Sequence, residues 1–456
     1  MEPIGDVADP FGRHRASHIE AAIPALLLAF ALAGCSPQPR AAWLGIDTRL
    51  GPPAAATQPA TAPVTAADRE IDLEMLGELG ISLLRVELMN WARIQPAPNA
   101  RYDFSVSDKI VKRAQQRGVD LLVVCDGIPG WAALPPAGRV PSRETSAAFA
   151  AFVRAFVERY DGDSTRDMPG LLHPLHSYEF IQEAEDVPTA DYAFWLKLFN
   201  ETVKGVSPKS TIVLGSLKSP GVKLPDLPAG EYHTWFERLL AEPGLHGPAY
   251  PYFDAVGFHN FPRRYPGRPP FESAVVYLRQ VLAAHRLDRP LWLTAFGANS
   301  NDPNTGGEER QAADLVRWTI HARSLGIERM YLHTLRDDPP SGKPPASRAF
   351  GLVRAATIGG RPDHKPAFEA MALLLKLVKN DSQITRRADG VYMIPGDKEP
   401  TYVLWRVASY DPSPFLIPGW WEVRTLTGQR YVRQGADIKV TEQPVFIQKT
   451  TSPFIH

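Results

Sequence analysis

The chain has 456 residues and a mass of 50.4 kDa, with 44% hydrophobic and 22% charged residues, which excludes a chain that is disordered or fibrous throughout. Its 50 basic residues balance its 50 acidic residues, so it lacks the positive field with which nucleic-acid-binding proteins attract phosphates. The length allows one large domain plus a small one, because a single α/β barrel takes about 250 residues or more.

The N-terminus carries an apolar run of 13 residues, Ala21–Ala33, preceded by basic residues and followed by Gly34-Cys35-Ser36. This is the layout of a signal peptide. A helix of that length, about 20 Å, is too short to cross a membrane. Leu32-Ala33-Gly34-Cys35 resembles the lipobox of bacterial lipoproteins, which implies that Cys35 is lipidated and becomes the new N-terminus.

Ser36, directly after the cysteine, points by the same resemblance to the outer membrane. We therefore expect a protein anchored by lipid in the bacterial cell envelope and facing the periplasm. A plain signal peptide, or an apolar helix with an incidental cysteine, is the alternative. Beyond Cys35 the chain has only Cys125, expected to be buried, and no His or Cys cluster has metal-ligand spacing. We expect no disulfide, metal or cofactor.

After a signal peptide over 1–34 and a tether over 35–41, residues 42–380 alternate short apolar runs with amphipathic helical patterns, which indicates repeated βα units. Eight strands are expected, at 43–47, 82–87, 120–125, 177–181, 211–214, 255–259, 291–295 and 329–333. The expected helices cover 108–117, 146–159, 190–204, 232–240, 271–285, 308–325 and 367–379. This pattern predicts a closed (β/α)8 TIM barrel, with 51–66 as a long loop after the first strand.

From 381 to 456 the pattern changes to short β runs, at 391–394, 402–405, 421–423, 438–441 and 445–448. Runs of this kind predict a small antiparallel module, of sandwich type, at the C-terminus.

In a (β/α)8 barrel the side chains at the C-terminal strand ends face one common mouth. Here those ends carry Asp47, Arg85, Glu87, Asp126, Gln182, Glu183, His259, Asn260, Ala295, His333 and Asp337, with Trp91 and Trp131 in adjoining loops. Carboxylates beside aromatic rings suit carbohydrate, because sugar C–H faces stack on the rings while hydroxyls need polar partners.

Several motifs occur in a distinctive order along the chain: Leu84-Arg85-Val86-Glu87 through Trp91, Ile94-Gln95-Pro96, Tyr102-Asp103-Phe104, Asp108, Tyr178-Glu179-Phe180-Ile181-Gln182-Glu183, Phe258-His259-Asn260-Phe261, Gly351-Leu352-Val353, Lys365-Pro366 and Pro444-Val445-Phe446-Ile447. Together they resemble clan A glycoside hydrolases, most closely family 39. In the family's strand-four motif the final glutamate is the general acid/base, which implies that role for Glu183. The resemblance also implies a carbohydrate ligand. From their places at the mouth and in the motifs we expect Arg85, Trp91, Asp126, Trp131, Gln182, His259, Asn260 and His333 to bind substrate, with core packing as the alternative for the two tryptophans.

The resemblance also implies a glutamate nucleophile at the end of strand seven, where this chain has Ala295 in Leu293-Thr294-Ala295-Phe296-Gly297. Retaining hydrolysis needs two carboxyl groups about 5–5.5 Å apart, and alanine removes one of them. The tyrosine that commonly follows the strand-six histidine is Phe261, and the asparagine that binds the sugar 2-hydroxyl is Gln182. We therefore expect a chain that is degenerate as a retaining glycosidase.

Three functions stay open. The leading hypothesis is a cell-envelope lipoprotein that binds, and in an active form hydrolyses, a polysaccharide; if Arg85 lacks a carboxylate partner, its charge would select an acidic one. The second is an active O-glycoside hydrolase with Glu183 as acid and Asp337 or Asp126 as base, about 6.5–9.5 Å away. The third is a non-catalytic scaffold of an exopolysaccharide assembly. A solvated turn is the alternative for Asp337.

Overall fold

The structure is a computed structural model, which describes residues 41–47, 66–135, 138–218, 220, 234–261, 272–301, 306–338, 349–357, 359–408 and 410–454. All of them belong to one compact unit, Arg40–His456. The expected signal peptide and Cys35 lie outside these residues. No helix within the described ranges has the length and apolar character that a membrane span requires.

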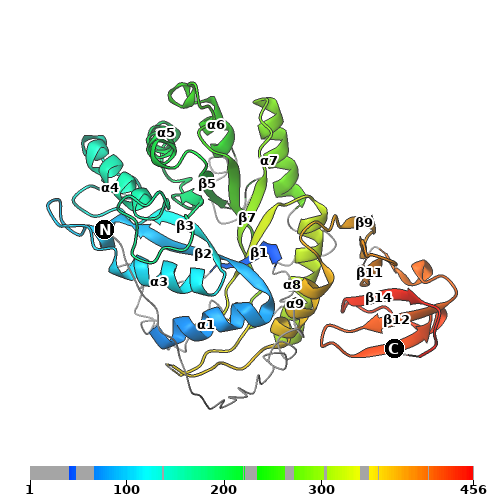
Figure 1. The fold of residues 1–456 in the computed structure, drawn as a ribbon. Coiled ribbons are helices and arrows are strands. Elements are labelled where there is room, and N and C mark those ends of the chain that lie inside the picture. Colours follow the sequence, from blue (N-terminus) through cyan, green and yellow to red (C-terminus); the bar gives the residue numbers. More distant parts are fainter. Residues whose placement is uncertain are drawn as a thin grey trace, which may run out of the picture. The chain divides into compact units, whose positions relative to one another are not determined.

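Eight parallel strands form a closed barrel in sequence order, which confirms the predicted TIM barrel (Figure 1). The strands are β1 (Ala41–Asp47), β2 (Ile81–Asn90), β3 (Asp120–Asp126), β4 (Ser177–Phe180), β5 (Thr211–Lys218), β6 (Ala255–His259), β7 (Leu291–Phe296) and β8 (Arg329–His333). The barrel closes where β1 pairs with β8, with Asp47 opposite His333. Buried aliphatic runs in these strands give the near-continuous apolar pattern of a parallel sheet covered on both faces.

The helices around the barrel agree with the predicted ones to within a few residues, with two exceptions, the helices over 66–79 and 91–94. They are α1 (Ala66–Leu79), α2 (Trp91–Ile94), α3 (Ser105–Gln116), α4 (Ser146–Glu158), α5 (Thr189–Val206), α6 (Trp235–Ala241), α7 (Glu272–Ala284), α8 (Gly307–Ser324) and α9 (Pro366–Leu377). Helix α1 was not expected, because the proline-rich loop predicted over 51–66 extends to the residue where this helix begins. The interior faces of these helices share one large hydrophobic core with the strands.

The barrel interior is layered, and this layering builds the mouth. An apolar layer contains Leu83, Leu122, Val213, Ala255, Trp292 and Tyr331. Gly45 belongs beside it, since a Cβ at that position would come within 2.6 Å of the Tyr331 ring. Because strand side chains alternate between faces, residues two positions further on point to the same interior: Asp47, Arg85, Thr294 and His333. A polar layer therefore lies above an apolar one, toward the C-terminal strand ends.

The C-terminal strands form a six-stranded antiparallel-paired sheet in the order β13-β12-β14-β11-β10-β9. They are β9 (Thr385–Ala388), β10 (Val391–Ile394), β11 (Thr401–Leu404), β12 (Trp420–Arg424), β13 (Arg430–Gln434) and β14 (Val445–Thr450). The expected strand over 438–441 is wrong, while β9 and β13 were not expected. The described strands make one sheet instead of the two of a sandwich. His321 Nδ1 of α8 lies 2.8 Å from the Tyr392 hydroxyl of β10, which ties this sheet to the barrel.

Candidate functional site

Arg85 lies at the centre of the polar layer. It projects from β2, is 3% exposed, and its Nε and Nη2 donate to both carboxylate oxygens of Glu179 at 2.7 Å. Its Nη1 donates to Asp47 at 2.8 Å and its Nη2 to Gln182 Oε1 at 2.9 Å. The guanidinium therefore donates four hydrogen bonds to three side chains, those of Glu179, Asp47 and Gln182. The expectation that Arg85 has a free charge for an acidic ligand is wrong, because two carboxylates already neutralise it.

Glu179, on β4, is fully buried and also accepts a hydrogen bond from Ser216 Oγ at 2.5 Å. Burial would raise the pKa of this carboxyl, but the Arg85 charge and its hydrogen bonds outweigh burial and hold the pKa below its usual value. Thr294 Oγ1 of β7 lies 2.5 Å from Ser216 Oγ. These contacts join four strands through the barrel interior and fix the orientation of Arg85.

Asp47 and His333 form a second pair where the barrel closes. The Asp47 Oδ2 atom lies 2.9 Å from His333 Nδ1, and the two side chains are 17% and 29% exposed. Burial opposes ionisation of Asp47, yet Arg85 and His333 lower its pKa well below the usual value. The His333 ring also meets Phe261 and Phe350 edge-on, with ring centres 5.6 and 5.7 Å away. This half-buried imidazole is therefore a polar group beside two aromatic rings, as is common in ligand pockets.

Glu183 follows β4 and contacts two cationic or polar partners. Its Oε1 lies 2.8 Å from His259 Nδ1, and its Oε2 is 3.8 Å from the Lys218 ammonium at the end of β5. The backbone at Glu183 has φ of 48°, in the left-handed region, which costs a non-glycine residue about 1–3 kcal/mol and often marks functional sites. Arg139 donates to the Glu183 carbonyl at 3.0 Å and so holds this turn.

The protonation state of Glu183 follows from these contacts. Burial raises its pKa, but the hydrogen bond and charge of His259, with Lys218 and Arg139, lower it below the usual value. Glu183 is thus a carboxylate at neutral pH, with a side chain 35% exposed. This state suits a base or an electrostatic stabiliser, whereas the expected role of general acid needs a proton held at neutral pH.

Ala295 is buried at the end of β7, 2% exposed, and pairs in register with His259. Its carbonyl accepts the backbone N–H of Asn260 at 3.0 Å. His259 and Asn260 are themselves 5% and 4% exposed. The strand register therefore sets a methyl group, and no carboxylate, beside the imidazole that holds Glu183.

Asp126, at the end of β3, and Glu87, three residues before the end of β2, are interacting carboxyls. Gln182 Nε2 is 3.5 Å from Asp126 Oδ2, and Asn90 Nδ2 is 2.5 Å from Glu87 Oε1. Burial raises the pKa of both carboxyls, and the charge of Asp126 adds to the shift at Glu87. Gln182 thus joins this acidic pair to Arg85.

The two tryptophans assigned to substrate binding differ in burial. Trp91 is 1% exposed, stacks on Phe152 with ring centres 5.5 Å apart, and donates to Gln95 Oε1 at 2.9 Å. Its expected place among ligand-binding residues is wrong, because the ring is enclosed by the core. Trp131 is only partly buried, edge-on to Trp91 at 5.0 Å, so it keeps a surface for a ligand.

Asp337 forms an ion pair away from Glu183. Lys365, 1% exposed, donates to its Oδ1 at 2.7 Å, and the backbone N–H of Gly351 donates to the same oxygen at 2.8 Å. Burial raises the Asp337 pKa, and Lys365 opposes that shift. The solvated turn expected for Asp337 is wrong, since its carboxylate neutralises a buried lysine, whereas the catalytic role of Asp337 stays a prediction.

Glu185 lies two residues beyond Glu183, and its carboxylate accepts the backbone N–H of Lys218. Burial is the largest cause that raises its pKa, to about 7, and the Glu183 charge adds to the shift. A carboxyl of this kind keeps its proton in about half of the molecules near pH 7, so it can act as a proton donor there.

The raised Glu185 pKa predicts a pH-dependent stability. Relative to an unfolded value of 4.5, the folded group is favoured while protonated, so its contribution is lost as pH rises from 4.5 toward 7. Glu185→Gln should therefore stabilise the protein at pH 8, by on the order of 2 kcal/mol, and change nothing at pH 4. Urea unfolding at both pH values measures this, with the exposed neighbour Asp186→Asn as control. Equal effects at both pH values would contradict it.

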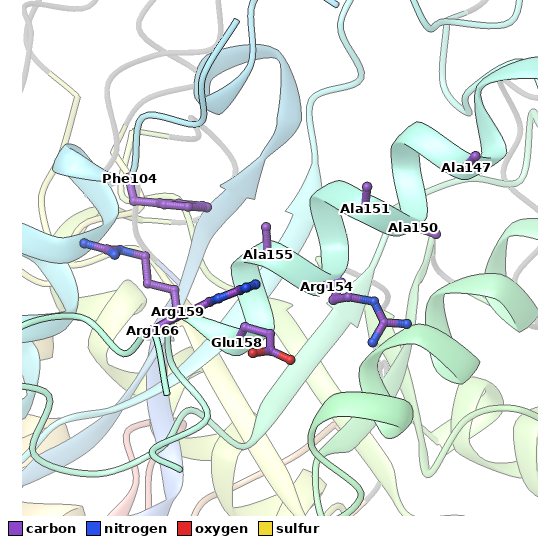
Figure 2. A pocket seen from close by; sticks show the side chains of 9 residues that line it. All are labelled: Phe104, Ala147, Ala150, Ala151, Arg154, Ala155, Glu158, Arg159 and Arg166. Atoms are coloured by element: carbon purple, nitrogen blue, oxygen red, sulfur yellow. The ribbon is translucent and has the colours of Figure 1, made fainter. Parts of the chain in front are cut away.

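Two other features of the described surface lie apart from this site. Asp161, Asp163 and Asp167 bring carboxylate oxygens within 4.8 Å of one another, but these oxygens accept backbone N–H groups of their own loop. A hollow of about 510 Å³ lies along the outer face of α4. Figure 2 shows alanines of α4 along it, with Phe104 and arginines around them. None of the predicted site residues lines it.

The residues that sequence reasoning missed are the ones that hold the others: Glu179, Ser216, Lys218 and Arg139. Glu179 belongs to the strand-four motif, but no role was predicted for it. Lys218 was missed because the strand was ended at residue 214, whereas β5 continues through Gly215. A Cβ at Gly215 would lie 1.9 Å from the carbonyl oxygens of Phe180 and Ile181, so the glycine permits close strand packing and does not end the strand.

Comparisons with known proteins agree with this geometry. The model of glycoside hydrolase family 42, described as beta-galactosidase, matches residues 59–138. Comparison with curated proteins gave no match.

Among solved structures, a family 39 glycoside hydrolase from Bacteroides cellulosilyticus WH2 is similar over 90% of this chain and 81% of its own, with 17% identity and a TM-score of 0.65. The family 39 enzyme from Xanthomonas axonopodis pv. citri covers 92% of this chain and 96% of its own at 14% identity and a TM-score of 0.59. A family 39 beta-xylosidase from Caulobacter crescentus covers 91% and 97% at 14% identity and a TM-score of 0.58. The chain thus has the fold of a glycoside hydrolase-type barrel.

Proposed function

We propose that this protein binds a polysaccharide at the C-terminal mouth of its barrel and does not form a covalent glycosyl intermediate. The observation that carries the proposal is the group of four partly exposed polar residues from the ends of β1, β4 and β8, Asp47, Gln182, Glu183 and His333, beside the partly buried Trp131. Hydroxyl-rich ligands need this mixture of carboxylate, amide and imidazole groups near an aromatic face.

The absence of a covalent step is inferred from Ala295. A nucleophile must stand about 5–5.5 Å from the acid/base, and the β7 position next to His259 carries a methyl group. The buried carboxylate of Glu179 is bound on both oxygens by Arg85, so it is not available to attack a sugar. The fold shared with family 39 barrels supports a carbohydrate ligand.

Binding is tested with a panel of neutral and uronic acid oligosaccharides, measured by calorimetry. We expect a neutral ligand to bind, since Arg85 has no free charge, and Trp131→Ala to weaken binding about tenfold by loss of one aromatic platform. The matched control is Trp420→Ala, a partly buried tryptophan of the C-terminal sheet, which should leave affinity unchanged. Failure of every oligosaccharide to bind would refute the proposal.

An active O-glycoside hydrolase with Glu183 as acid has less support, because His259 and Lys218 keep Glu183 ionised.

We further propose that the chain is a lipoprotein of the cell envelope, anchored through Cys35. Mass spectrometry of the membrane fraction should show a diacylated N-terminal cysteine. A scaffold role in an exopolysaccharide assembly would instead show as co-purification that does not depend on sugar.

A further inference from the structure

His259 has one bonded ring nitrogen and one unbonded. Its Nδ1 lies 2.8 Å from Glu183 Oε1, whereas its Nε2 is buried and has no hydrogen-bond partner among the described residues. Beside a carboxylate, a neutral imidazole keeps its proton on the nitrogen that faces the carboxylate and its lone pair on the other. The Glu183–His259 dyad therefore presents Nε2 as a proton acceptor.

The surroundings of this acceptor favour an O–H donor as its partner. Besides Glu183, the carboxylates of Glu179 and Asp47 interact electrostatically with His259. The strand register sets the Ala295 methyl beside this ring. A buried ring nitrogen without a partner is costly, and a hydroxyl or water that donates to it removes that cost.

We propose that His259, oriented by Glu183, is the base that deprotonates a water molecule beside Ala295, and that this water attacks the anomeric carbon of a bound glycoside with inversion. The inference rests on the proposed function, since it needs a sugar bound at the mouth. It assigns Glu183 to a positioning role instead of that of proton donor.

Each bond and proton in the step is accounted for. The water oxygen bonds to the anomeric carbon, the bond from that carbon to the leaving oxygen breaks, and the water proton passes to His259 Nε2. The leaving oxygen takes the carboxylic proton of Glu185. Solvent then carries the proton from His259 back to Glu185, and no other reactant is needed.

Lys218 positions Glu185 for the role of proton donor. The backbone N–H of Lys218 donates to the Glu185 carboxylate, while the ammonium of the same residue lies 3.8 Å from Glu183 Oε2. One residue thus holds both carboxyls at the end of β5. The Glu183 pKa is lowered, as the ionised partner of His259 requires, and the Glu185 pKa is raised, as a proton donor requires.

The dyad is tested first without any reaction. Long-range ¹⁵N NMR of the full chain should show His259 with a protonated Nδ1 and an unprotonated Nε2 at pH 7, and Glu183→Gln should shift that tautomer balance. The matched control is His364, whose Nδ1 lies 2.9 Å from Glu369 Oε1 on the outer surface. An Nε2-protonated His259 in the wild type would overturn the proposal.

The reaction is tested with the oligosaccharide that binds most tightly in the panel above and with an aryl β-xyloside. We expect ¹H NMR to show the inverted anomer first, and His259→Gln to lower kcat by about 10²- to 10⁴-fold while binding changes little. Glu185→Gln should slow the oligosaccharide, which has a poor leaving group, more than the aryl xyloside. His364→Gln should act like the wild type.

Three results would overturn the inference: retention of configuration, a covalent adduct with a 2-fluoro glycoside, or binding without turnover by the wild type. The last leaves the proposed binding function intact, whereas loss of all binding would remove both. If His259→Gln does not fold, the tautomer measurement and the product anomer of the wild type still decide.

Discussion

Replacing Arg85 by methionine should destabilise the fold by about 3–5 kcal/mol, the cost of leaving a buried charge without its partner. Glu179 is fully buried and receives two hydrogen bonds from Arg85 at 2.7 Å, so the variant would keep a carboxylate with no cation beside it. Urea unfolding measures the loss. It should shrink as pH falls, because protonation of Glu179 removes the unpaired charge.

Two matched variants separate this charge effect from simple loss of packing. Arg406→Met removes an arginine whose bond to Asp411, at 2.7 Å, is on the surface with side chains 57% and 42% exposed, so it should cost less than about 1 kcal/mol. Adding Glu179→Leu to Arg85→Met should recover part of the stability, since the fully buried charge of Glu179 then disappears, while Asp47 keeps only its bond to His333. An Arg85→Met protein as stable as the Arg406→Met protein would show that the hydrogen bonds of Arg85 do not stabilise the barrel.

The barrel itself was predictable because its signals are local. Each strand is a short apolar run and each helix repeats apolar residues at three and four positions, as at Phe149, Phe152, Val153 and Phe156. Closure of eight parallel strands then brings their ends to one mouth. Asp47 and His333, 286 positions apart in the chain, meet for this reason.

The partners of each site residue were not predictable, because they depend on which side chain reaches which across the mouth. The strand-four motif placed Glu183 at the mouth, but His259 binds it from 76 positions away, and no local pattern encodes that distance. In the same way Arg85 seemed unpaired once Ala295 replaced a carboxylate. Glu179, 94 positions further on, supplies the missing charge from inside the barrel.

The burial of Trp91 was likewise not predictable from local sequence. Replacing this residue should have the second large effect on stability. Its indole is enclosed by Phe149, Phe152 and Trp131, with ring centres 5.0–5.6 Å away, and its Nε1 bonds to Gln95. Trp91→Ala should therefore cost about 3–5 kcal/mol of unfolding free energy, through lost burial and the cavity left behind.

The partly buried Trp131 is the counterpart that distinguishes core from ligand surface. Trp131→Ala should cost less stability than Trp91→Ala, because part of its ring already faces solvent, yet it should weaken oligosaccharide binding more than Trp91→Phe, which keeps an aromatic ring in the core. Thermal unfolding and calorimetric titration on the three variants measure both quantities. If Trp91→Phe lost binding while it kept wild-type stability, Trp91 would belong to the ligand surface, as the sequence pattern first indicated.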